Sequence, residues 1–120
     1  MPKILIVEDD KFLRELLAKK LQDEGLEIVQ AIDGEEGVKK AEEELPDLLL
    51  LDLILPGING FDVLKKLKEN PKTSALPVIV LSNLGQKEDV ERALTLGAKD
   101  YLIKANFTLE EIFDKIKKYL

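Results

Sequence analysis

The sequence predicts an α/β fold in which five parallel strands form one sheet and five helices cover its two faces. Short apolar runs alternate five times with longer segments whose apolar residues recur at helical spacing. Strands that alternate with helices in this way pair in parallel through crossover connections. The chain has 120 residues, the length of one domain with a proper core. We therefore expect a single doubly wound domain over residues 1–120.

Five segments have the composition of buried strands, and turn signals separate each of them from the next segment. They are residues 3–7, 26–32, 47–52, 77–82 and 100–104. The third is the clearest, because the unbroken apolar run Leu48 to Leu51 is typical of a strand buried on both faces. Pro56, Gly57 and Gly60 then mark a loop. We expect this strand to lie in the centre of the sheet, with Asp52 at its carboxyl end.

Five segments show the amphipathic spacing of helices. They are residues 11–24, 35–45, 60–70, 86–96 and 109–120. The positions expected to face the core in the first, second, third and last of these are Leu13, Leu16, Leu17 and Leu21; Val38, Ala41 and Leu45; Phe61, Leu64 and Leu67; and Leu109, Ile112, Phe113, Ile116 and Leu120. Gly25, Pro46 and Gly97 are typical helix stops, and Thr108 is a typical N-cap of the last helix.

Composition and charge exclude several classes of function. The sequence has no Cys and no His, so it offers no disulfide, no Cys or His metal ligand and no phosphodonor histidine of its own. No run of about 18 apolar residues is present and the start of the chain lacks a signal-peptide pattern. We therefore expect a cytoplasmic protein without membrane contact. The formal net charge of −6 argues against nucleic-acid binding.

Four predicted strands end in residues that can carry chemistry, and a parallel sheet brings these ends to one edge. They are Glu8, Asp9 and Asp10 after the first strand, Asp52 after the third, Ser82 and Asn83 after the fourth, and Lys104 after the fifth. Each alone is also typical of a solvated strand end, but their coincidence at one edge favours a site. Clustered carboxylates suit Mg²⁺, and a carboxylate can be the nucleophile in phosphoryl transfer. We therefore predict Mg²⁺-assisted phosphorylation of Asp52.

Four motifs add a resemblance that covers essentially the whole chain. The segments ILIVEDD, LLLLDLILPGINGFD, VIVLSN and GAKDYLIK stand in the order in which receiver domains of two-component response regulators carry them, and the sequence resembles this family. The resemblance implies the chemotaxis-type, flavodoxin-like fold with strand order 2-1-3-4-5. Since residues 1–120 leave no room for an output domain, we expect a stand-alone receiver and, by default, a monomer.

The resemblance also implies a role for each acidic residue by its position. Asp52 matches the phosphoacceptor, and Lys104 matches the lysine that pairs with the phosphoryl group. Glu8 and Asp9 match the acidic pair that holds Mg²⁺. Asp52 itself and the main-chain carbonyl of Ile54 complete the protein ligands that the family gives to this metal.

Ser82 and Tyr101 match the residues that convert phosphorylation into a signal. In the family, the hydroxyl residue moves to the phosphoryl group and the aromatic residue swings inward with it. This coupling remodels the face formed by the fourth helix, the fifth strand and the fifth helix, where partners dock. The resemblance implies a phospho-His donor on a sensor histidine kinase or phosphotransfer protein, and a downstream protein target. Such a domain promotes its own phosphorylation but is a switch, not an enzyme.

Four positions depart from the usual family pattern. Asn83 stands where a small Ala is common, and its larger side chain would narrow access to Asp52. Ala105 follows Lys104 where the family carries Pro after a cis bond. A cis bond without Pro costs about 2.5–4 kcal/mol, so we expect either a trans bond with a re-routed loop up to Phe107 or a strained cis bond. Ile54 and Leu84 are apolar where the family lines the path of attacking water. This change predicts slow loss of the phosphoryl group.

Three other functions fit parts of the sequence. An interaction module that does not depend on phosphorylation would keep the site as a vestige, which the missing Pro favours and the intact acidic, Ser and Lys set opposes. An engineered scaffold would keep these residues for folding alone, although clustered carboxylates cost stability without a metal. A phosphatase with an Asp nucleophile would need a second acid two residues after Asp52, where Ile54 stands.

Overall fold

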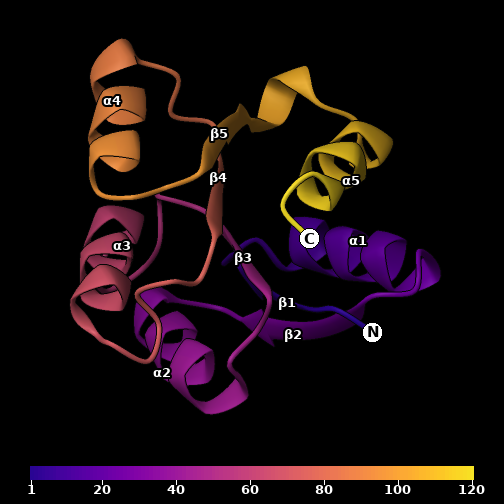
Figure 1. Ribbon diagram of the computed structural model, residues 1–120. Helices are drawn as coiled ribbons and strands as arrows, with labels where there is room; N and C mark the ends of the chain where they lie inside the picture. The colour runs from indigo at the N-terminus through magenta and orange to yellow at the C-terminus, as the bar shows by residue number, and fades with distance from the viewer.

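Strands and helices alternate along the whole chain, as Figure 1 shows for the computed structural model, which describes residues 1–120. The strands are β1 (Lys3–Val7), β2 (Glu27–Ala31), β3 (Leu48–Leu51), β4 (Val78–Ser82) and β5 (Asp100–Ile103). The helices are α1 (Lys11–Asp23), α2 (Gly34–Glu44), α3 (Gly60–Glu69), α4 (Lys87–Thr95) and α5 (Leu109–Lys117). One 3₁₀ turn, η1 (Lys104–Asn106), lies between β5 and α5.

All five strands belong to one parallel sheet with the order β2-β1-β3-β4-β5. The predicted fold class and strand order are thereby confirmed. As expected from its unbroken apolar run, β3 lies in the centre of the sheet, and all four of its residues are buried.

The helices form two layers, with α1 and α5 on one face of the sheet and α2, α3 and α4 on the other (Figure 1). Successive side chains of a strand point to opposite faces, so a central strand serves both layers. Leu48 and Leu50 pack in the core beneath α1 and α5, whereas Leu49 and Leu51 pack in the core beneath the other three helices. This division explains why β3 is apolar at every position instead of at every second one.

The register of the strands brings the predicted site residues together at one edge. The last pair in register between β1 and β3 places Glu8 and Asp52, the residues directly after these strands, side by side. The last pair between β4 and β5 joins Ser82 to Ile103, so that Lys104, the residue directly after β5, lies one position beyond the end of β4. Residues from four strands therefore meet at the carboxyl edge of the sheet.

Three leucines expected to face the core are exposed instead. The exposed fractions are 38% for Leu16, 62% for Leu45 and 45% for Leu120. In α1 the buried face is centred one position further along, so that Ala18 is buried in place of Leu16. Leu45 has left α2 and adopts a left-handed conformation with φ of 45°. Leu120 lies beyond Lys117, the last residue of α5, so helical spacing no longer applies to it.

The segment after β5 settles two expectations from the sequence. Lys104 begins the turn η1 and is not the last residue of the strand, because the chain bends at this point. No cis peptide bond occurs in the chain, so the trans bond before Ala105, the first of the two alternatives, is confirmed. The amide of Phe107 donates to the carbonyl oxygen of Lys104 at 3.4 Å and closes the turn.

None of the helices combines the length and apolarity needed to cross a bilayer.

Candidate functional site

Asp52 lies directly after the central strand and is held at the edge of the sheet by its main chain and its side chain. Its amide donates to the carbonyl oxygen of Val7 at 3.0 Å, which continues the pairing between β3 and β1. Its Oδ1 accepts a hydrogen bond from the amide of Ile54 at 3.2 Å. Only 6% of the residue is exposed, so the carboxylate has a defined position and little contact with solvent.

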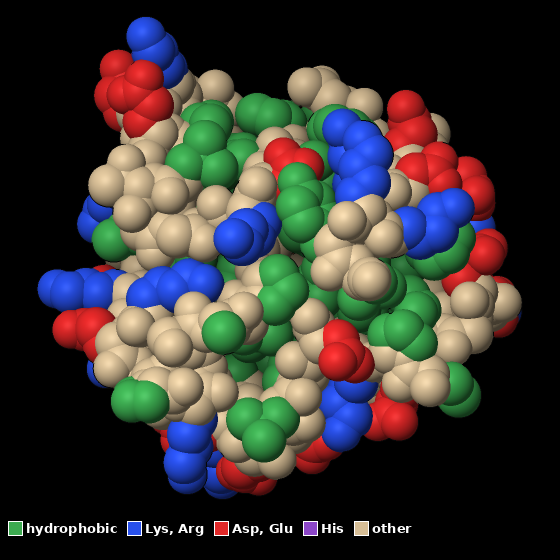
Figure 2. All heavy atoms as spheres, in the orientation of Figure 1, with side chains coloured by type: hydrophobic (Ala, Val, Ile, Leu, Met, Phe, Trp, Pro, Cys, Tyr) green, Lys and Arg blue, Asp and Glu red, His purple; other side chains and the backbone are tan.

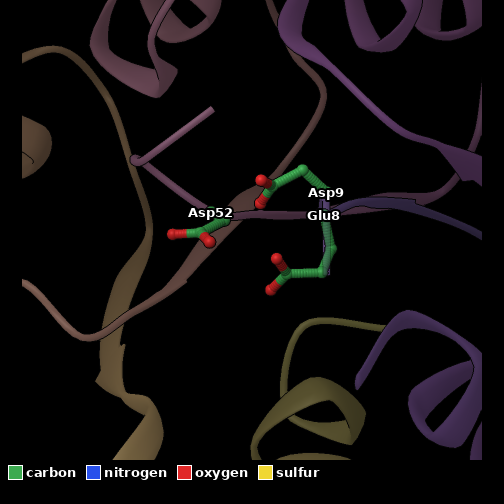
Figure 3. A group of neighbouring side chains, drawn as sticks. All are labelled: Glu8, Asp9 and Asp52. Atoms are coloured by element: carbon green, nitrogen blue, oxygen red, sulfur yellow. The ribbon is translucent and has the colours of Figure 1, made fainter. Parts of the chain in front are cut away.

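Glu8 and Asp9 bring two further carboxylates to Asp52. Figure 3 shows their side chains leaving the end of β1 in different directions, both toward the side on which Asp52 lies. One carboxylate oxygen from each of the three residues lies within 4.8 Å of the others. Glu8 is buried and Asp9 is exposed. Asp10 turns away and caps α1, where its Oδ1 accepts from the amide of Leu13 at 3.2 Å.

Lys104 reaches from η1 into this acidic cluster and bridges its two buried members. Its Nζ lies 2.6 Å from Oε1 of Glu8 and 2.8 Å from Oδ2 of Asp52. Burial alone would lower the pKa of Lys104, but the hydrogen bonds with Asp52 and Glu8 outweigh it and raise the pKa. Burial also raises the pKa of Glu8 to about 7, with the charge of Asp52 acting in the same direction and Lys104 opposing it.

Gly60, at the start of α3, allows the helix to pack directly against the main chain of Asp52. A Cβ atom on Gly60 would lie 2.5 Å from the carbonyl oxygen of Asp52 and 2.5 Å from Cα of Leu53. The amide of Gly60 also donates to the carbonyl oxygen of Leu53 at 2.9 Å. The sequence marked Gly60 as a loop signal and as the start of a helix, but it did not predict this close approach, which arises from segments that meet in the fold.

Ser82 and Tyr101 converge on Leu84 in the loop after β4. The Oγ of Ser82 accepts from the amide of Leu84 at 3.3 Å, and the Tyr101 hydroxyl donates to the carbonyl oxygen of Leu84 at 2.6 Å. Ser82 is fully buried, and burial raises the pKa of Tyr101. The two residues that the sequence singled out as a switch therefore both contact the same loop.

The donor set at this edge fits Mg²⁺. Three carboxylates whose oxygens lie within 4.8 Å of one another supply hard oxygen ligands, and the chain supplies no soft ligand there. The exposed carboxylate of Asp9 leaves room for the water molecules that Mg²⁺ usually retains. Ile54 lies at the mouth of the site with 55% of its surface exposed. Its carbonyl as a metal ligand stays a prediction.

Arg14 is a further residue of the site that the sequence analysis did not single out. It lies in the first turns of α1, and its Nη1 donates to the carbonyl oxygen of Glu8 at 2.9 Å. A sequence signal for it exists in retrospect. Arg14 follows the acidic run by one helical turn, a spacing that returns its side chain to the end of β1.

The fold and the site define a class of protein: a doubly wound domain with a five-stranded parallel sheet, in which three carboxylates and one lysine meet at the carboxyl edge. The family model of the response regulator receiver domain matches residues 4–117, and the chain belongs to this family. The resemblance noted in the sequence is thereby confirmed, as is the flavodoxin-like fold.

Curated relatives and solved structures agree with this assignment. The chain is 38% identical to the phosphate regulon transcriptional regulatory protein PhoB of Rhizobium meliloti over 120 residues, which are all of this chain and 52% of that protein. It is also 38% identical over 120 residues, all of this chain and 49% of the relative, to the DNA-binding dual master transcriptional regulator RpaA of Synechocystis. The chain thus spans about half the length of these curated relatives. Among solved structures, the chemotaxis protein CheY4 of Vibrio cholerae matches with a TM-score of 0.93 and 28% identity, over 100% of this chain and 99% of that one.

Membership of the family carries its general properties. Receiver domains are phosphoacceptor switches that depend on Mg²⁺, and they act between sensor kinases and downstream targets. Figure 2 shows one face of this molecule, on which acidic and basic side chains are interspersed and no extended basic patch is present. The expected lack of nucleic-acid binding stays a prediction for residues 1–120, since the longer relative RpaA is DNA-binding by name.

Proposed function

We propose that this receiver accepts a phosphoryl group on Asp52 from the phospho-His of a sensor kinase or phosphotransfer protein, in a reaction that depends on Mg²⁺. The observation that carries the proposal is the position of the Asp52 carboxylate. It is 6% exposed, 2.8 Å from the Lys104 ammonium and grouped with the carboxylates of Glu8 and Asp9. A structural aspartate at a strand end would need neither the lysine nor the second and third acid.

The proposed transfer needs only groups that the site and the donor supply. A carboxylate oxygen of Asp52 attacks phosphorus, the phosphorus–nitrogen bond of the donor breaks, and the imidazole leaves and takes up a proton from solvent. Lys104 lies where its ammonium can pair with a phosphoryl oxygen, and the buried hydroxyl of Ser82 is the second candidate donor to that group. A divalent cation held by Glu8, Asp9 and Asp52 would neutralise the remaining negative charge.

The proposed signal passes through the loop after β4. Ser82 Oγ accepts a hydrogen bond from the amide of Leu84. A phosphoryl group on Asp52 would accept the hydroxyl proton of Ser82, and the movement of Ser82 toward it would disturb the bond to Leu84. The Tyr101 hydroxyl, on β5, donates to the carbonyl oxygen of the same residue. A movement of Ser82 can therefore reach β5 through the main chain of Leu84. We propose that the face formed by α4, β5 and α5 changes in this way and binds the downstream target.

Intact mass spectrometry after incubation with acetyl phosphate or phosphoramidate tests the proposal. We expect one phosphoryl group on the wild type with Mg²⁺ and none with chelator. Asp52→Asn should stay unmodified, whereas the control Asp114→Asn, which changes an exposed carboxylate on α5, should behave like the wild type. No adduct on folded wild-type protein under any condition would leave the phosphorylation-independent module or the scaffold as the better account.

Nuclear magnetic resonance of the phosphorylated protein tests the signalling half of the proposal. Amide resonances of α4, β5 and α5 should shift on phosphorylation of the wild type and shift less in Tyr101→Ala. Shifts confined to the neighbours of Asp52 would contradict the proposed route. The stand-alone status, the monomeric state and the cytoplasmic location expected from the sequence stay predictions.

A further inference from the structure

Arg14 binds the main chain of the residues that carry the two acids of β1. Its Nη1 donates to the carbonyl oxygen of Glu8 at 2.9 Å and, more weakly, to that of Asp9 at 3.5 Å. Its Nε donates to Oε1 of Gln30 in β2 at 3.1 Å. One guanidinium therefore ties the end of β1 to the neighbouring strand and to α1.

Arg14 lies beside an acidic cluster, yet its guanidinium binds main-chain carbonyl oxygens instead of carboxylates. Lys104 is the only side chain that forms ion pairs with the acids of the site, through Glu8 and Asp52. Arg14 forms no ion pair, so it does not occupy the carboxylate oxygens of Asp9. A guanidinium that served mainly to neutralise charge would take a carboxylate, for which its fork geometry is suited.

Glu8 and Asp9 differ in how firmly other groups hold them. The amide of Glu8 donates to the carbonyl oxygen of Ala31 at 3.1 Å, and its Oε2 accepts from the amide of Asp10 at 3.1 Å. Asp9 is exposed and follows the last strand residue by two positions. The bond from Arg14 to the Glu8 carbonyl oxygen therefore holds the peptide unit between Glu8 and Asp9. The next unit, between Asp9 and Asp10, is held by the weaker Arg14 bond and by the Glu8 carboxylate.

We propose that Arg14 is a positioning residue for the divalent-cation site, and that Gln30 holds its guanidinium in place. This inference rests on the proposed function, because it concerns the Mg²⁺ site of that function. Groups that orient the ligands of a metal raise the affinity of the site, although they do not touch the metal. The positive charge of Arg14 has the opposite effect, since it repels a cation. Removal of the side chain therefore lowers the affinity if positioning dominates and raises it if charge dominates.

The test is a titration with Mg²⁺ alone, followed by amide resonances, which also report whether each variant is folded. The variants are Arg14→Gln, which removes fork and charge, Arg14→Lys, which keeps the charge, and Gln30→Ala. Lys68→Gln is the matched control, because Lys68 also donates to two carbonyls, those of Ser74 at 3.3 Å and Leu76 at 3.1 Å, in the loop that leads to β4.

We expect the Mg²⁺ dissociation constant of Arg14→Gln to rise by about tenfold, the low end for such orienting groups. Arg14→Lys and Gln30→Ala should show smaller increases, and Lys68→Gln should bind as the wild type does. An unchanged or lower dissociation constant in Arg14→Gln overturns the positioning role. If Arg14→Gln does not fold, the other two variants decide, and unchanged constants in both overturn the role.

The outcome also separates this inference from the proposed function. Wild-type protein that binds no Mg²⁺ contradicts both. Wild-type protein that binds Mg²⁺ with the same dissociation constant as a folded Arg14→Gln contradicts the role of Arg14 alone and leaves the phosphoacceptor role of Asp52 intact.

Discussion

At the scale of single residues, Lys104 balances two buried carboxylates that would otherwise repel each other. Glu8 is 3% exposed and Asp52 is 6% exposed, and both lie within 2.8 Å of the same ammonium. One positive charge serves two negative ones, so the cluster keeps a net negative charge. The site therefore suits a cation. The pKa of Glu8 is raised mainly by burial, and the charge of Asp52 adds to this effect.

The pKa of Glu8 predicts how the stability of the metal-free protein depends on pH. Burial raises this pKa from 4.5 to about 7, so between these values the folded state binds more protons than the unfolded state. The contribution of Glu8 to the free energy of unfolding should therefore be largest below pH 4.5. It should fall by up to about 3 kcal/mol as the pH rises through 7. Urea unfolding in chelator at about pH 5 and about pH 8 measures most of this change.

Glu8→Gln is the control for this pH dependence, because glutamine has a similar shape and does not titrate. The variant should lose the part of the slope that Glu8 contributes. A slope as steep in Glu8→Gln as in the wild type would assign the pH dependence to other groups.

The apolar side chains of Ile54 and Leu84 predict a long-lived phosphoryl group. Ile54 is 55% exposed at the mouth of the site, and Leu84 is half-buried. Because neither side chain has a polar group, neither can orient a water molecule for attack on phosphorus. Ile54→Asn or Leu84→Glu should speed the loss of the phosphoryl group several-fold, as followed by intact mass over time. Ile32→Asn, at an exposed position after β2, should leave the rate unchanged. Equal rates in all variants would remove the hypothesis.

The chemistry-bearing residues could be predicted from the sequence because each follows an apolar strand. Glu8, Asp52 and Lys104 lie together as expected, since parallel strands end at one edge. Arg14 could not be assigned in the same way, because its partners are main-chain carbonyls and carry no residue type. The role of Gly60 could not be predicted for a related reason, because it depends on how closely α3 approaches the end of β3.

At the scale of the elements, the helix starts support the site. Asn59 caps α3 through a hydrogen bond from the amide of Asp62, and Thr108 caps α5 in a reciprocal capping box with Glu111. These caps fix where the loops after β3 and β5 must end. The Asp52 and Lys104 side chains come from those two loops, so their 2.8 Å contact depends on both helix starts.

The contact between α3 and β3 predicts a large effect of one methyl group at Gly60. Gly60→Ala should lower the free energy of unfolding by about 1–3 kcal/mol, because the clash is with main-chain atoms that cannot move aside. Gly85→Ala is the control, since its Cβ would meet only the end of the Ile103 side chain, at 3.1 Å. Its effect should stay within about 0.5 kcal/mol. Urea unfolding measures both, and equal effects would contradict the close approach.

The order and type of the elements could be predicted from hydrophobic period alone, but their ends could not. Strand β2 begins at Glu27 and ends at Ala31, one residue inside each predicted limit, because pairing with β1 stops there. The same lack of tertiary information placed Leu16 and Leu45 in the core, whereas packing of α1 and the left-handed end of α2 expose them.

At the scale of the whole molecule, the two cores and the site have separate positions. The cores lie on the two faces of the sheet, and the acidic cluster and Lys104 lie at its carboxyl edge, where Leu53 and Tyr101 still contact one core. Under the proposed function, we expect a change of charge on Asp52 to alter the neighbouring loops while both cores keep the fold intact. This separation suits a domain whose output is a change of surface.

The most direct test of the central claim is to locate the phosphoryl group on the chain. After phosphorylation with Mg²⁺, borohydride reduces an aspartyl phosphate to the alcohol homoserine, which peptide mass spectrometry locates by sequence. The account predicts homoserine at position 52 and nowhere else. Homoserine at Asp9 or another carboxylate, or a phosphoryl group that borohydride does not remove, would contradict it.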